Sequence, residues 1–334
     1  MDLVASIVIP LIKSIIIVVG LLVGFAYTTW FERKLAARFT MRYGPNRAGP
    51  FGLLQPVADG IKAIFKEEII PSKADKVLYF IAPGLSIATA LLAFAVVPVG
   101  RPIHLFGREI PLHLADVNIG VLYLMAVAGL ATYGVVLAGW SSNNKYSLMG
   151  ALRTAAQMIS YELPMGLALI SILLMVGDLS LVKIVEYQRP LPLIALQPVA
   201  FIIYLICSFA EAGRTPFDLP ETENELISGY TTEYGGIKFP LFFMAEYIHM
   251  ITASAIVTTL FLGGWQGPFA DLHPLIPPLW FFVKTVFMLF LFVWVRSSLP
   301  RVRYDKLMKF CWKFLAPLAL VNLAVTAIVL VLAT

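Results

Sequence analysis

The chain contains little charge for its length. Only 13% of its 334 residues are charged, whereas 59% are hydrophobic. Soluble globular domains average roughly 45–50% apolar residues and cover their cores with a charged surface. This composition excludes such a surface, so we expect a polytopic membrane protein.

Cysteine and histidine are also scarce. The two cysteines, Cys207 in an apolar run and Cys311 in a basic segment expected to be a loop, provide no disulfide framework. They are too few to hold an iron–sulfur cluster, which normally takes four protein ligands. The four histidines show neither HxxxH nor HExxH spacing, so we expect no metal site. The net charge of +5 is interpreted as a signal of membrane orientation, not of nucleic-acid binding.

What the chain does have is a series of long apolar runs. A membrane-spanning helix needs about 20 mostly apolar residues. The first run continues to Phe31 with no small-residue cleavage site after it, so we expect it to be retained and not cleaved as a signal peptide. The sequence predicts one all-α membrane domain over 1–334 with eight spans: 8–31, 77–99, 118–140, 157–177, 194–212, 240–263, 279–297 and 314–333.

The basic residues are distributed unequally between the connecting segments. The odd-numbered loops contain 19 Lys and Arg residues and the even-numbered loops contain 4. Because cytoplasmic loops carry the excess of positive charge, the odd loops are predicted to be cytoplasmic. Both termini are then expected on the non-cytoplasmic side, in a plasma (inner) membrane that we expect to be bacterial.

The first of these loops begins with Glu32, Arg33 and Lys34 and contains a turn rich in glycine and proline, YGPNRAGP at 43–50. Apolar residues at helical spacing then predict an amphipathic helix over 53–70. Two interpretations are open for this helix. It could lie passively on the cytoplasmic membrane surface, or it could form one wall of a cavity in which Asp59 and Glu67 are functional acids.

Three glutamates are predicted inside the helix bundle: Glu162, Glu211 and Glu246. Burial disfavours the charged form of a carboxyl group, which makes such residues candidates for carrying protons. The alternative is a structural hydrogen bond or ion pair, with Lys284 as one candidate partner. Three acids in neighbouring spans favour a polar axis for protons.

An acidic segment at 211–236, within the loop 211–239, contains six carboxylates and one cation, Arg214. The carboxylates are Glu211, Asp218, Glu221, Glu223, Glu225 and Glu233. Composition alone leaves two interpretations open: a docking surface for a basic partner, or a funnel that collects protons.

Two long motifs make the chain resemble a known family. GPNRAGPFGLLQPVADGIKAIFKE and EAGRTPFDLPETENELISGYTTEYGG, followed by FFMAEY, are similar to the NuoH family, the quinone-tunnel membrane subunit of respiratory complex I. The resemblance implies a subunit of NADH:quinone oxidoreductase that forms much of the quinone tunnel and couples quinone reduction to proton translocation.

The resemblance also assigns roles to residues. Around the quinone cavity it places Glu32, Arg33, Arg42, Asp59 and Glu67. In the proton route and its coupling it places Glu162, Glu211, Arg214, Asp218, Glu221, Glu223, Glu225 and Glu246. No redox centre is expected in this chain, so electrons must come from an iron–sulfur cluster in a neighbouring subunit.

The partners implied are a quinone, the bilayer, subunits of the peripheral quinone-reducing arm, and small and antiporter-like membrane subunits. Three alternatives remain at this stage. The chain could be a homologous subunit of a hydrogenase or of a complex with another electron donor, an autonomous proton or cation transporter, or a passive scaffold in which the glutamates are structural.

Overall fold

The computed structural model describes residues 2–105, 108–218 and 228–333. Seven of its helices are long and apolar enough to cross a membrane. They are α1 (Asp2–Phe39), α3 (Lys76–Phe94), α4 (Gly120–Ser141), α5 (Lys145–Val176), α10 (Lys238–Phe261), α11 (Ile276–Ser298) and a last helix built from α12 (Tyr304–Phe310), the π-helical turn η3 (Cys311–Leu315) and α13 (Ala316–Ala333). The expected all-helical, polytopic architecture is confirmed.

The predicted fifth span differs from the others because it is divided. It consists of α7 (Leu193–Leu196) and α8 (Pro198–Glu211), a 14-residue apolar helix. Pro198 has no backbone N–H to continue the hydrogen bonding of α7, so it begins a new helix at the first position, where proline is favoured. The remaining elements are η1 (Pro50–Gly52), α2 (Gln55–Phe65), a hairpin of β1 (Ile103–Leu105) and β2 (Arg108–Ile110), α6 (Leu181–Tyr187) and η2 (Gly229–Thr231).

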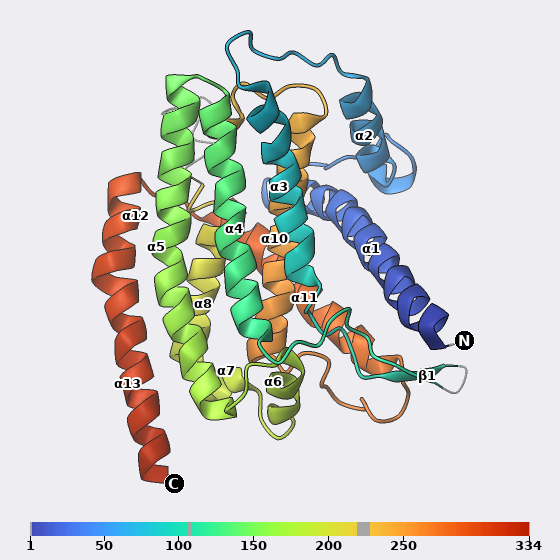
Figure 1. The fold of residues 1–334 in the computed structure, drawn as a ribbon, viewed down its shortest axis with the longest axis vertical. Coiled ribbons are helices and arrows are strands. Elements are labelled where there is room, and N and C mark those ends of the chain that lie inside the picture. Colours follow the sequence, from blue (N-terminus) through green and yellow to red (C-terminus); the bar gives the residue numbers. More distant parts are fainter. Residues whose placement is uncertain (1, 106–107, 219–227, 334) are drawn as a thin grey trace.

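The long helices form a bundle around α10, which packs against α1, α3, α8 and α11 (Figure 1). Helices α3, α4 and α5 stand nearly parallel beside it, whereas α1 and α11 are steeply inclined. Helix α2 lies at one end of the bundle, and α6 and the hairpin lie at the other (Figure 1). We call these the α2 end and the α6 end. Both ends of the chain lie away from α2.

Glycines allow α4 to approach its neighbours closely. A Cβ atom at Gly139 would lie 2.3 Å from the Cβ of Ala151 in α5, and one at Gly134 would lie 2.3 Å from Ser86 Oγ in α3. Small residues of this kind let helices pack tightly in a membrane, where there is no water to drive their association. This packing fixes α3, α4 and α5 as one unit.

Two sequence predictions need correction. The amphipathic helix is shorter than the predicted 53–70, because Lys66 adopts an extended backbone and ends α2 at Phe65. Cys311 lies not in a loop but within the last helix, where it is fully buried. Its thiol donates to Ser160 O at 3.1 Å, which joins this helix to α5.

Candidate functional site

The α2 end of α1 carries the first group of predicted site residues. Arg33 Nη1 lies 2.6 Å from Asp59 Oδ2 of α2, and Gln55 Nε2 donates to the other oxygen of the same carboxylate at 3.0 Å. Trp30 Nε1 also donates to Phe51 O at 3.2 Å. These contacts attach η1 and α2 to the end of α1 and bring Arg33 and Asp59 together.

Glu32 points to the other side of α1, into the bundle. It is only 8% exposed and forms an ion pair with Arg296 at the end of α11. The Tyr247 hydroxyl of α10 hydrogen-bonds to the same carboxylate. Sequence reasoning identified Glu32 but missed Arg296 and Tyr247, which meet it from helices far along the chain.

Two other predicted cavity residues are not part of these contacts. Arg42 is exposed, and its Nε donates to Thr40 Oγ1 at 3.3 Å. Glu67 is exposed and follows the end of α2. Its neighbour Glu68 was not singled out from the sequence. Glu68 forms an ion pair with Lys238 at the start of α10, with 2.6 Å between Oε1 and Nζ.

An ionic cluster continues from Tyr247 into the acidic segment. The Arg214 guanidinium lies 4.1 Å from the centre of the Tyr247 ring, and its Nη2 is 3.9 Å from Glu246 Oε2. Tyr230 of η2 donates to Glu246 Oε1 at 3.2 Å. Arg214 is 4% exposed, so the only cation of this segment is inside the protein, beside a membrane glutamate.

The segment that carries Arg214 is held in place by α5 and by the loop after α11. Gln157 Nε2 donates to Ala210 O and to Phe217 O, each at 2.8 Å. Asp218 is buried and pairs with Arg301 at 3.2 Å. Glu221, Glu223 and Glu225 lie outside the described residues.

Glu233, the last acid of the segment, contacts the start of α5 and Tyr79 of α3. Its carboxylate accepts from Asn144 Nδ2 at 2.6 Å, and its carbonyl accepts from the Tyr79 hydroxyl at 2.7 Å. The neighbouring Tyr234 stacks on Tyr79 with ring centres 4.2 Å apart. Burial raises the pKa of Tyr234 above its ordinary value, so this hydroxyl is neutral and hydrogen-bonds to Ser141 Oγ at 3.1 Å.

Two adjoining hollows lie deeper in the bundle. The first, of about 50 Å³, is lined by Glu211, Glu246 and His249 together with residues of α3, α4 and α5. The second, of about 40 Å³, extends from Glu211 and His249 towards the α6 end. Because Glu211 and His249 line both hollows, they stand where the two meet.

Glu162 completes the set of three membrane glutamates. It is half-buried on α5, and its Oε1 is 3.5 Å from the Cβ position of Gly129 in α4. It lies close enough to Glu211 for their charges to interact. Lys284, the candidate partner for these acids, is elsewhere: its Nζ donates to Leu262 O, Gly264 O and Gln266 O at 2.5–3.1 Å, at the α6 end of α10. Lys284 is therefore not the partner that the alternative interpretation of these glutamates offered.

An apolar groove runs along α1 towards Glu32. It has a volume of about 430 Å³ and lies between α1, α10 and α11. Its lining includes Ile17, Gly20, Gly24, Ile251, Phe281 and Leu289, and at the α2 end it reaches Trp30 and Phe31. The groove therefore leads from the apolar flank of the bundle to Phe31, the residue before Glu32 on α1.

Among the described residues, no group of three His, Cys, Asp or Glu side chains could hold a metal ion. The site is thus a set of paired charges, two internal hollows and an apolar groove. Such an arrangement is suited to binding an apolar molecule with a polar head and to moving protons.

Comparisons with known proteins agree on one family. The sequence pattern of the family described as NADH dehydrogenase matches residues 12–327. The H subunit of NADH-quinone oxidoreductase from Protochlamydia amoebophila is 55% identical over 302 residues, which cover 90% of this chain and 91% of that protein. Subunit 8 of the same oxidoreductase from Thermus thermophilus is 53% identical over 322 residues, covering 96% and 87%. A match of this extent places the chain in a family, so the protein belongs to the NADH dehydrogenase family, in the group of the H subunits of NADH-quinone oxidoreductase.

Proposed function

We propose that this chain is the membrane subunit of a proton-translocating NADH:quinone oxidoreductase that forms much of the quinone-access tunnel and couples quinone reduction to proton translocation. The observation that carries the proposal is the order of three features along the bundle: the apolar groove that reaches Phe31, the Glu32–Arg296 pair that begins at the next residue, and the ionic cluster that leads from there to Glu246. The names of the relatives favour a quinone complex fed by NADH over a hydrogenase.

The groove matches the chemistry of a quinone. A quinone has a long apolar tail and a small head with two carbonyl groups. Burying the tail against Ile17, Phe281 and Leu289 removes apolar surface from water or lipid contact and orients the molecule along α1. The head then arrives at a polar region that contains Glu32, Arg33, Arg42, Asp59 and Glu67.

The ionic cluster gives a physical path for coupling. Reduction of a quinone consumes two electrons and two protons, and in this proposal the electrons come from an iron–sulfur cluster in a neighbouring subunit. A change of charge at the head alters the field at the Glu32–Arg296 pair. Tyr247 and Arg214 connect that pair to Glu246, and from there Glu211 and Glu162 continue into the bundle. The loop acids Asp218, Glu221, Glu223 and Glu225 are assigned to the same coupling region.

The proposal includes a topology. The divided α7–α8 element crosses the membrane as the fifth of eight spans. Residues 1–334 form one membrane domain, and α2 lies in the membrane interface on the cytoplasmic side. Both termini face the other side of a bacterial plasma membrane. The partners are the peripheral-arm subunits near the α2 end and small and antiporter-like subunits within the membrane.

Filling the groove tests whether it holds the quinone. Gly20 lies in the groove, and a Cβ atom built there meets no other atom within 4 Å. In the assembled complex, Gly20→Leu should raise the KM for a long-tailed quinone by about tenfold, because a branched side chain would occupy the space of the tail. The KM for a short-tailed quinone analogue should change less.

Gly84→Leu is the matched control. Gly84 is also an exposed helical glycine with no atom near its Cβ position, but it lies in α3, away from the groove. If Gly20→Leu and Gly84→Leu give the wild-type KM for the long-tailed quinone in fully assembled complexes, the groove does not hold the tail.

A further inference from the structure

Glu211 and Glu246 are on different helices, and His249 lines the same hollow as both of them. It lines the hollow that contains both glutamates and also the second hollow beyond Glu211. It follows Glu246 by three residues on α10, so the two side chains project from the same face of that helix. The resemblance assigns His249 no role. We infer that His249 is a further proton-carrying residue of this chain, linking Glu246 to Glu211 through water held in the second hollow.

The hydroxyl of Thr252 indicates that this hollow holds water. Ser254, Thr258 and Thr259 of the same helix each donate to the carbonyl four residues earlier, at 2.8–2.9 Å. Thr252, although only 2% exposed, has no hydrogen-bond partner for its hydroxyl anywhere in the described ranges. It lines the second hollow three residues after His249. A buried hydroxyl without a protein partner is normally satisfied by water, and the hollow has room for water.

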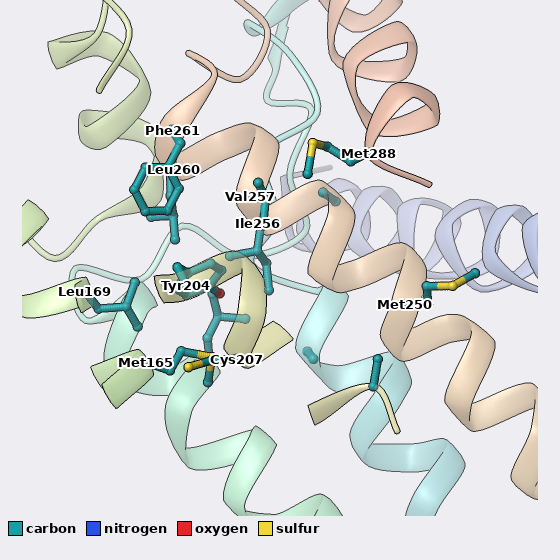
Figure 2. Packing of buried hydrophobic residues seen from close by; sticks show 14 of the residues in the cluster. Met165, Leu169, Tyr204, Cys207, Met250, Ile256, Val257, Leu260, Phe261 and Met288 are labelled. Carbon is teal, nitrogen blue, oxygen red and sulfur yellow. The ribbon is translucent and has the colours of Figure 1, made fainter. Parts of the chain in front are cut away.

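The walls of the hollow confine that water. Towards the α6 end, the lining includes the apolar side chains of Leu169, Ile256 and Leu260, from α5 and α10 (Figure 2), and the Tyr204 hydroxyl beside them hydrogen-bonds to Ser208. Apolar side chains offer no hydrogen bonds to a chain of water molecules. A proton that enters beside His249 is therefore kept near Glu211 and can pass on to Glu162, not through the bundle to its α6 end.

Imidazole suits this position because it can accept a proton on one ring nitrogen and release one from the other. When a protonated carboxyl group on one side gives its proton to the free ring nitrogen, the ring becomes a cation with two N–H groups. Release of the second proton to the carboxylate on the other side restores a neutral ring. The net result is one proton moved between the carboxyl groups, with no other atom changed.

Charged groups around the ring control these steps. Glu246 lies on the same helix, Glu211 faces it from α8, and Glu162 and Arg214 are next to these acids. An ionised glutamate stabilises the imidazolium, whereas Arg214 opposes it. The charge state of the cluster that reaches Glu32 would therefore set whether His249 accepts a proton.

The inference rests on the proposed function, and its test separates the two. In the assembled complex, His249→Asn keeps a polar side chain that does not titrate. We expect NADH-driven proton uptake into inverted membrane vesicles to fall by about tenfold or more, as removal of a positioned proton carrier does. The pH profile of the remaining rate should also lose the contribution of the imidazole, because asparagine does not titrate. His273→Asn, in the exposed loop before α11, is the matched control and should behave as wild type.

Thr252→Val is the second variant. It preserves the shape of the side chain and removes only the hydroxyl, so it should assemble normally and still show a loss of proton uptake. Wild-type rates and pH profiles in both His249→Asn and Thr252→Val, alongside a loss of pumping in Glu211→Gln, would overturn the inference and leave the proposed function standing. If Glu211→Gln also pumps at the wild-type rate, the proposed proton route itself is wrong.

Discussion

At the scale of single residues, two buried charges of this protein, Glu32 and Lys238, are matched by opposite charges from distant parts of the chain. Glu32 forms an ion pair with Arg296, which lies 264 residues later in the chain. Lys238 at the start of α10 forms an ion pair with Glu68 in the first loop. An ion taken out of water is costly unless a partner compensates for it. The pairs therefore fix where the loops at the α2 end lie relative to the bundle.

Lys238 provides a test of this role. Its ammonium is 3.7 Å from the centre of the Phe80 ring and 2.6 Å from Glu68, and the residue is 3% exposed. Lys238→Met removes the ion pair and the cation–π contact, while the partly exposed Glu68 can be resolvated. We expect a loss of about 1–3 kcal/mol in stability, measured as a lower midpoint of thermal unfolding of the purified complex. Lys76→Met, at an exposed lysine, should leave the midpoint unchanged. Equal midpoints for both variants would contradict this account.

The sequence could predict the acids of the site but not their partners. Glu162, Glu211 and Glu246 stand out because they interrupt apolar runs. Arg296 and Tyr247 resemble ordinary interfacial residues until the fold brings them to Glu32. His249 could have been found from its spacing of three residues from Glu246, but a search limited to metal-binding patterns passes over it.

At the scale of elements, the long apolar runs predicted the spanning helices well, because about 20 apolar residues in a row leave few alternatives. The length of the last helix was underestimated, because its first part contains three lysines, Lys306, Lys309 and Lys313. In that part the burial pattern explains why the chain is helical. The buried residues recur every four positions, at Leu307, Cys311, Leu315 and Ala319, and each is at most 1% exposed. Their common face packs on the bundle, and the charged residues remain on the opposite side.

Helix α10 carries Glu246, Tyr247 and His249, so its anchoring at both ends matters. At the α6 end, Lys284 of α11 donates to three carbonyl groups that follow or end the helix. Gln188 supports the same turn by donating to Thr259 O at 2.9 Å and accepting from Gly263 N at 2.9 Å. These bonds satisfy carbonyl and amide groups that a helix end leaves open.

Removing the lysine should loosen this end. In Lys284→Met, three carbonyl groups lose their donor, at an expected cost of about 2–4 kcal/mol. Amide hydrogen exchange at residues 258–266 should then be faster than in the wild-type protein. Lys13→Met, at the other lysine within an apolar helix, should not change exchange in this region. Unchanged exchange in Lys284→Met would show that Lys284 does not hold the end of α10.

At the scale of the whole molecule, the proposed topology places the α2 end on the cytoplasmic side. The two native cysteines of the protein are fully buried, so a single introduced cysteine can report the orientation of the chain in the membrane. Lys73→Cys, at the α2 end, should react with a membrane-impermeant maleimide in inverted vesicles and not in right-side-out vesicles. His273→Cys, in the loop between α10 and α11, should show the reverse. The opposite result for both variants would invert the proposed topology.

The central claim is that the buried glutamates carry protons in response to quinone reduction. The most direct measurement compares NADH:quinone reductase activity and proton uptake in inverted vesicles that contain the Glu211→Gln complex, with Glu186→Gln as a control at an exposed acid on α6. Our account predicts that Glu211→Gln lowers proton uptake by about tenfold or more while the complex assembles normally, and that Glu186→Gln matches the wild type. Wild-type proton uptake in a normally assembled Glu211→Gln complex would contradict it.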